Sequence, residues 1–256
     1  MHNKSILIKT GDFFFKWRNL IFPLILIVIF SAWMPPAEYF GTKGLEDFKD
    51  LVAGFIIFSG LALRSATIGW AYIKRGGINK TVYADTLVTR GYFGLCRNPL
   101  YVGNMLIYAG VFLIHGHPAV IVLGIMLYYF IYQSIIAAEE YYLTQKFGAE
   151  YLEYCKQVPR WMLKISNAPT ALDNMTFNIK RSIAKDYTTI LNACAAIVLI
   201  ELLERYAFYP RADFIESVQV GGVVLAVLFI GAVTIKALKK YTILLNVVEE
   251  NQYSCN

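Results

Sequence analysis

Six runs of mainly apolar residues alternate with polar segments along the chain, and this alternation is the clearest pattern in the sequence. An α-helix needs about 20 predominantly apolar residues to cross the ~30 Å hydrocarbon core of a bilayer. Several runs are long enough, although the first is short for a complete span. The pattern therefore predicts an all-α, polytopic membrane helix bundle with about six transmembrane helices, over about residues 20–34, 51–73, 99–114, 118–139, 187–208 and 218–235.

The polar segments between the runs divide the chain into four parts. Residues 1–50 form an N-terminal anchor helix and its loop, and residues 51–163 form the membrane core. A polar linker over 164–186 precedes a C-terminal transmembrane hairpin and tail over 187–256. Within the core, residues 149–157 alternate tyrosine, leucine and cysteine with charged neighbours. This alternation predicts a cytosolic amphipathic helix that lies against the membrane face.

Composition and charge agree with a membrane protein and argue against a nucleic-acid partner. Hydrophobic residues make up 57% of the chain and charged residues only 16%, compared with about 25% charged residues in a typical soluble domain. The net charge is +6, but the lysines and arginines gather in every second polar segment rather than in one patch. This distribution follows the positive-inside rule and predicts that both termini are cytoplasmic. The four cysteines are isolated, which predicts neither a metal site nor disulfides.

Candidate chemistry centres on Arg97–Gly103, which begins the third run, and on Glu139 and Glu140, which end the fourth. Asn98 followed by Pro99 predicts a helix start, with the asparagine capping free backbone N–H groups. Such a start offers N–H groups and the positive end of the helix dipole to a carboxylate, and an adjacent arginine adds a bidentate contact. Adjacent helical residues point about 100° apart, so the two glutamates are expected to perform different tasks.

Two further blocks flank this motif in the order found in a known enzyme superfamily. Leu87–Tyr92 precedes it, and Phe147–Tyr154 with Val158-Pro159 follows it. Over about residues 85–163 the chain resembles the isoprenylcysteine carboxyl methyltransferase and phospholipid methyltransferase superfamily of integral membrane enzymes. The resemblance implies S-adenosylmethionine as the cofactor, bound on the cytoplasmic side. It also implies a lipophilic or membrane-associated acceptor whose reacting group is a carboxylate, an amine or a thiol.

The same resemblance implies that Arg97, Asn98, Pro99, Tyr101 and Gly103 contact the cofactor. Glu139 and Glu140 are expected contacts as well, because a carboxylate at this place can accept hydrogen bonds from the cofactor's ammonium or ribose hydroxyls or pair with a cation such as Arg97. Glu140 and Arg160 are the catalytic candidates, with Glu140 as the base for an amine or thiol acceptor. In the resembled superfamily, the segment that corresponds to residues 149–157 covers the cofactor.

The chain departs from the superfamily at two positions. Asn98 stands where the superfamily commonly has histidine, and asparagine keeps the cap but cannot take a proton near neutral pH. Gln157 stands where isoprenylcysteine members often carry arginine, which argues against a prenylcysteine carboxylate as the acceptor.

Two other functions compete with methyl transfer. Sterol reductases have a similar helix arrangement and use NADPH, although the Glu139-Glu140 pair argues against them. A transporter or assembly subunit is suggested by Arg64, a cation inside an apolar run that serves a site, snorkels to the membrane surface or forms a structural pair. The extra hairpin points the same way. Its small residues over 192–196 and its predicted Glu201–Arg205 pair indicate that it packs beside the core without touching the cofactor.

Overall fold

The protein is built from helices. The structure is a computed structural model that describes residues 4–39, 41–71 and 81–240. Its long helices are α1 (Ile6–Ala32), α2 (Lys43–Trp70), α3 (Pro99–His115), α4 (Pro118–Phe147), α7 (Ile179–Phe208) and α8 (Arg211–Lys240). The short elements are η1 (Gly91–Gly94), α5 (Ala149–Gln157), η2 (Ile165–Asn167) and α6 (Ala168–Ala171). The described residues form no strand, and Tyr39 and Thr42 pair only in an isolated bridge, so the predicted all-α class is confirmed.

Five of the described helices, α1, α2, α4, α7 and α8, are long and apolar enough to cross a membrane. The remaining predicted run forms α3, whose 17 residues rise about 25 Å. This shorter helix packs against α2, α4 and α7. The predicted polytopic bundle is therefore confirmed, with five full-length spans and one shorter apolar helix among the described residues.

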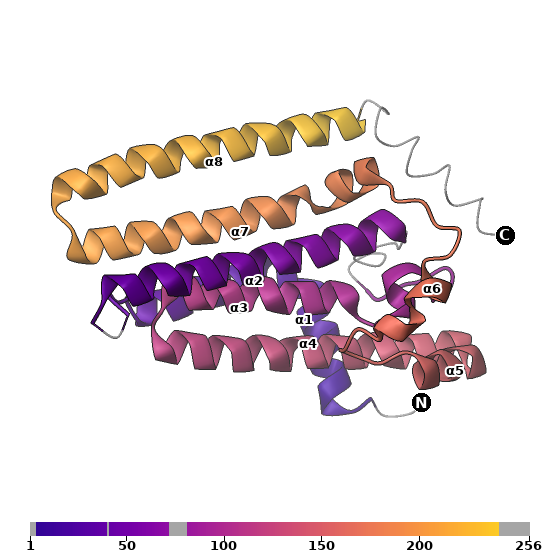
Figure 1. Ribbon diagram of the computed structural model, residues 1–256. Coiled ribbons are helices and arrows are strands. Elements are labelled where there is room, and N and C mark those ends of the chain that lie inside the picture. Colours follow the sequence, from indigo (N-terminus) through magenta and orange to yellow (C-terminus); the bar gives the residue numbers. More distant parts are fainter. Residues whose placement is uncertain (1–3, 40, 72–80, 241–256) are drawn as a thin grey trace.

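The long helices run in alternating directions, as Figure 1 shows. Helices α2, α3, α4, α7 and α8 lie roughly along one axis, whereas α1 passes behind them and packs against α4. Residues 81–98 and 148–178 gather at one end of the bundle, together with the start of α1 and the end of α8. We call this the basic end, because it holds Arg90, Arg97, Lys156, Arg160 and Lys164. The connections α1–α2, α3–α4 and α7–α8 lie at the opposite end.

Several helices extend beyond the apolar runs that predict them. Helix α1 begins at Ile6 because the Ser5 hydroxyl accepts a hydrogen bond from the backbone N–H of Ile8 (3.4 Å). Helix α7 begins at Ile179, where the Asn178 side chain accepts from the N–H of Arg181 (2.9 Å). Side-chain caps satisfy N–H groups that would otherwise lack partners, so polar residues can open a helix. The last part of the predicted linker is consequently the first two turns of α7.

Glycines let α2 and α3 approach closely. A Cβ atom at Gly103 would lie 2.5 Å from Cγ of Arg64 and 2.9 Å from the carbonyl oxygen of Gly60. At Gly110 it would lie 2.5 Å from Cγ1 of Ile57. Small residues at such crossings replace side-chain bulk with close backbone packing, the usual basis of helix association in membranes. Gly103 thus faces α2.

Aromatic side chains join α1 to the core. The rings of Phe22 and Tyr128 have centroids 5.3 Å apart, and those of Tyr108 and Tyr128 are 4.0 Å apart. The Tyr128 side chain is fully buried, and its hydroxyl donates to the carbonyl of Phe22 (2.8 Å). A buried tyrosine hydroxyl requires such a partner. This bond therefore fixes the position of α1 along α4.

We predict that the basic end is cytoplasmic, because of the positive-inside rule. An impermeant thiol reagent applied to intact cells should label Glu38→Cys, in the exposed α1–α2 connection. It should label Lys164→Cys only after the membrane is opened. The parent chain, with its own four cysteines, is the control. Gly116 is less suitable than Glu38 because its φ of 76° disfavours a side chain. Labelling of Lys164→Cys from outside would contradict the predicted orientation and place the basic end on the outer side of the membrane.

Candidate active site

A cavity of about 1720 Å³ opens at the basic end and extends between the helices. Five of the sequence-predicted site residues line it: Arg97, Asn98, Tyr101, Glu139 and Glu140. Pro99, Gly103 and Arg160 are not among its lining residues. Pro99 occupies the first turn of α3, as predicted. The sequence motifs therefore converge on one cavity, although three of their residues do not line its surface.

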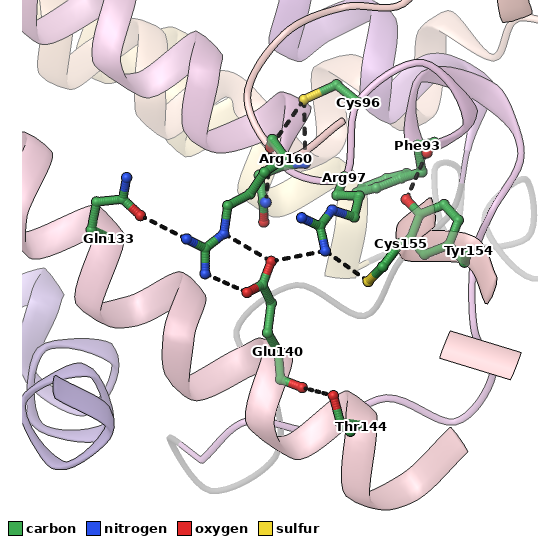
Figure 2. A network of polar contacts seen from close by, with 10 residues as sticks. Phe93, Cys96, Arg97, Gln133, Glu140, Thr144, Tyr154, Cys155 and Arg160 are labelled. Atoms are coloured by element: carbon green, nitrogen blue, oxygen red, sulfur yellow. Dashed lines mark hydrogen bonds and ion pairs between the residues drawn. The ribbon is translucent and has the colours of Figure 1, made fainter. Parts of the chain in front are cut away.

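Glu140 lies between two arginines, as Figure 2 shows. The Nε atom of Arg160 donates to Oε1 of Glu140 (2.9 Å) and its Nη2 donates to Oε2, which makes a bidentate pair. Nη1 of Arg97 lies 3.2 Å from Oε1 of the same carboxylate and donates to Sγ of Cys155 (2.7 Å). Nη1 of Arg160 donates to the side-chain oxygen of Gln133 (3.2 Å). We call these five residues the Glu140 network.

Backbone contacts fix the two arginines relative to each other. The N–H of Arg97 donates to the carbonyl of Pro159 (2.9 Å). The carbonyl of Arg160 accepts from Nδ2 of Asn98 (3.0 Å) and from the Cys96 thiol (3.5 Å). These hydrogen bonds therefore hold segments 96–98 and 159–160 together, although about 60 residues separate them.

The predicted capping role of the Asn98 side chain is wrong. Asn98 occupies the cap position of α3, and its backbone carbonyl accepts from the N–H groups of Tyr101 and Val102 (both 3.0 Å). Its side chain makes no capping hydrogen bond and instead holds the carbonyl of Arg160. A side-chain amide can serve only partners within its reach, and the 159–160 segment brings a carbonyl there.

Glu139 faces different partners from Glu140, as the angular separation of adjacent helical residues predicts. The hydroxyl of Tyr101 donates to Oε1 of Glu139 (2.7 Å). Arg18 of α1 also lines the cavity and interacts electrostatically with Glu139 and Tyr101. Arg18 was not predicted as a site residue, because a cation before an apolar run is typical of a positively charged flank. Its place near the start of the first run was the only available signal.

Helix α5 closes one side of the cavity. Its residues Tyr151 and Tyr154 line the space, and the hydroxyl of Tyr154 donates to the carbonyl of Phe93 (2.6 Å). The predicted amphipathic helix is confirmed, with Gly148 at a φ of 53° separating it from α4. Nearby, burial raises the pKa of the Cys96 thiol to about 11. Cys96 is therefore protonated at neutral pH and does not act as a thiolate nucleophile.

Arg64 forms a structural pair, one of the three roles left open by the sequence. Its Nε donates to Oδ2 of Asp186 (3.1 Å), and Nη2 donates to Oδ1 of Asp186 and to the Thr189 hydroxyl (3.1 Å). Nη1 donates to the Asn104 side chain and to the carbonyl of Leu100 (3.4 Å). These contacts use all five N–H groups of the guanidinium. Arg64 thus ties α2 to α3 and α7 and has no N–H left for a ligand.

The C-terminal hairpin packs beside the core, and its first helix reaches the cavity. One face of α7 lines it, through Thr188, Thr189, Asn192, Ala193, Ala195, Ala196, Leu199 and Leu203. The predicted Glu201–Arg205 pair is confirmed at 3.9 Å near the other end of α7. In the described part of the chain, no group of three histidine, cysteine, aspartate or glutamate residues is placed to hold a metal ion.

Comparison with known proteins shows what the core is similar to. Residues 50–150, which hold most of α2 and all of α3 and α4, match the family model described as phospholipid methyltransferase. This part of the chain is therefore similar to phospholipid methyltransferases. The resemblance stated from the sequence blocks is thereby confirmed. Helices α7 and α8 lie outside the matched residues.

Two curated relatives share parts of this core. The cobalt-zinc-cadmium resistance protein CzcN of Cupriavidus metallidurans is 31% identical over 108 residues, which cover 41% of this chain and 48% of that protein. Protein-S-isoprenylcysteine O-methyltransferase A of Arabidopsis thaliana is 35% identical over 72 residues, 28% of this chain and 36% of the relative. The chain thus spans less than half the length of the curated relatives it matches. No solved structure matches significantly.

Proposed function

We propose that this protein is an integral membrane methyltransferase that uses S-adenosylmethionine to methylate a lipophilic acceptor. The observation that carries the proposal is the single cavity that joins the Glu140 network to an apolar interior. Its volume of about 1720 Å³ exceeds the roughly 300–1,000 Å³ of ordinary ligand pockets. It therefore has room for a polar cofactor and an apolar acceptor together. The family of the core supports the same reaction.

The residues at the basic end fit the charged groups of this cofactor. Its carboxylate would lie at Arg97, beside the start of α3, where a guanidinium and a helix dipole both favour an anion. Its ammonium would lie at Glu139, whose carboxylate faces the cavity. Tyr151 and Tyr154 would offer ring faces to the positively charged sulfur. When bound, the cofactor supplies a methyl group on a sulfonium, which is a good leaving group.

Glu140 holds the arginines in this proposal and does not act as the base suggested by the sequence. Its two oxygens accept bonds from Arg160 and face Arg97, so little capacity remains for an acceptor's proton. Arg160 then acts as a positioning residue, because it touches Glu140 and not the cavity.

We therefore propose an acceptor that arrives as an anion, a carboxylate or a thiolate. Apart from Arg64, whose charge Asp186 balances, four arginines and three carboxylates line the cavity, and this excess of positive charge attracts an anionic head group. With the cofactor bound, an anionic oxygen or sulfur of the acceptor would take the methyl group as the bond from the methyl carbon to the sulfonium broke. A neutral thioether would be released, so the residues of the cavity would not need to move a proton. The protein's task is to align the groups and exclude water.

Cofactor binding is tested by thermal unfolding of the protein in lipid nanodiscs. At ~100 times the dissociation constant, S-adenosylmethionine or its demethylated product should add ~2.7 kcal/mol to the free energy of unfolding. NADPH is the matched control and separates the reductase alternative. Stabilisation by NADPH, or by neither ligand at millimolar concentration, would contradict the proposal.

The acceptor class is tested with S-adenosylmethionine carrying a radioactive methyl group and a membrane lipid extract. We expect label in the lipid fraction. Label released by mild base identifies a methyl ester and hence a carboxylate acceptor. Base-stable label identifies an amine or a thiol. An amine product would point to Glu139 as the base, because of the two adjacent glutamates it is the one without a bidentate arginine pair.

A further inference from the structure

The interior part of the cavity has three helical walls, and two of them lie outside the residues that match the family model. We call this part the apolar arm and define it by its lining residues Phe22, Leu26 and Phe30 of α1, Ile107, Tyr108 and Val111 of α3, and Ala193, Ala196, Leu199 and Leu203 of α7. The matched residues run from 50 to 150 and therefore include α3 but neither α1 nor α7. The C-terminal hairpin thus supplies a wall that the matched segment does not contain.

The side chains that α7 presents to the arm are small near the basic end and larger deeper in the bundle. Its lining positions recur at intervals of three and four residues, so they occupy one face of the helix. Alanines at 193, 195 and 196 leave space beside α3, whereas Leu199 and Leu203 project larger side chains one and two turns further on. The width of the arm along its length is thus set by α7.

The position of this wall is fixed by polar contacts with α2. The Arg64–Asp186 pair is almost fully buried, with 4% and 5% of the two side chains exposed. One turn away, the hydroxyls of Ser65 and Ser182 lie 2.6 Å apart, and Nε of Arg181 donates to the carbonyl of Ile68 (2.8 Å). Helix α1 is held separately, because it packs against α4. Two independently anchored helices therefore face each other across the arm.

The length of the arm fits one hydrocarbon chain. From Tyr101, beside Glu139, to Val111 the helix α3 rises about 15 Å. This is half of the ~30 Å hydrocarbon core, or the depth of one leaflet. The arm is continuous with the arginine-rich basic end, where the proposed anionic head group and the cofactor would meet. An amphiphile with one apolar chain matches both ends of this space.

We propose that α7 selects the acceptor by chain length. A single extended apolar chain lies between α1, α3 and α7, and the small side chains of Ala193 and Ala196 let it pass to the level of Leu203. The inference rests on the proposed function for the identity of the head group. Binding of the chain does not itself require methyl transfer, so the two can be tested apart.

The test uses straight-chain fatty acids that carry a photoreactive diazirine at the methyl end, bound to the full chain in nanodiscs. Probes shorter than, equal to and longer than ~15 Å should crosslink progressively deeper, the longest near Leu203. In Ala196→Phe the ring should block the arm, and crosslinking near Leu203 should fall roughly 10-fold. This is the lower end of the discrimination that an apolar pocket achieves against one extra methylene. Crosslinked peptides are identified by mass spectrometry.

Ala226→Phe is the matched control, because Ala226 is an exposed alanine on α8 that does not line the cavity. Leu203→Ala tests the opposite direction and should admit a longer probe. Stabilisation by S-adenosylmethionine is measured on every variant and reports both folding and the proposed function. A depth pattern that shifts with Ala196→Phe and Leu203→Ala supports the inference even if the cofactor does not bind. Equal crosslinking in Ala196→Phe and Ala226→Phe, with cofactor binding intact, overturns the inference alone.

Discussion

Replacing Asp186 by leucine is expected to destabilise the protein by about 3–5 kcal/mol, the usual cost of removing one member of a buried ion pair. Arg64 would lose both carboxylate bonds while its guanidinium stayed within the bundle, where 4% of the side chain is exposed. A cation inside a membrane helix bundle has no water to replace the lost partner. The measurement is the thermal inactivation midpoint in nanodiscs, or chemical unfolding in detergent.

Two controls separate this effect from a general loss of polar contacts. The double variant Arg64→Met/Asp186→Leu removes both charges and should recover most of the stability, because apolar residues of similar size can replace a buried pair. Glu153→Gln removes the pairing charge of an exposed ion pair, with 74% and 57% of the two side chains exposed, and should change the midpoint little. Equal midpoints for Asp186→Leu and Glu153→Gln would show that the pair does not hold α7.

Replacing Glu140 by glutamine is expected to weaken S-adenosylmethionine binding by about 2 kcal/mol, or roughly 30-fold, the lower end for a hydrogen-bonded charge pair. Glutamine keeps the shape of the side chain but leaves two arginines facing each other without a negative charge. The lower end applies because 34% of the Arg160 side chain and 21% of the Glu140 side chain are exposed. Isothermal titration of the purified variant measures the affinity directly.

Arg97→Ala should weaken binding by a similar factor, because it removes the proposed carboxylate contact. Arg160→Lys should have a smaller effect, since lysine keeps the charge but cannot form the bidentate pair. Glu201→Gln alters an exposed pair on α7 that lies 3.9 Å apart, and it should leave the affinity unchanged. If Glu201→Gln abolished binding and Glu140→Gln did not, the cofactor site would lie elsewhere in the bundle.

The helices were predictable because their signal is local. A run of apolar residues reports its own preference for lipid, and the residues around Asn98-Pro99 and Phe147-Gly148 report where a helix starts and stops. The apolar run predicted over about residues 99–114 matches the position and length of the short helix α3. Residues 179–186 were assigned to a linker because they are polar, yet a side-chain cap and contacts with α2 make them helical.

The site was predictable only in part, because its residues come from segments far apart in the chain. Arg97 and Glu140 were expected together from the order of the motif blocks. The bond of Asn98 to the carbonyl of Arg160 was not, since it joins positions 62 residues apart. Arg18 was missed for the same reason, because no local pattern indicates that α1 crosses behind α4.

The sequence by itself determined an all-α membrane bundle, the place of each apolar helix and the motif that carries the chemistry, because lipid preference and helix capping act within a few residues. Only the tertiary structure decided what each charge does. It paired Arg64 with Asp186 across 122 positions, placed Glu140 between two arginines, and brought α7 to the wall of the cavity. A buried charge takes the partner that packing brings within about 3 Å, and packing depends on the whole bundle.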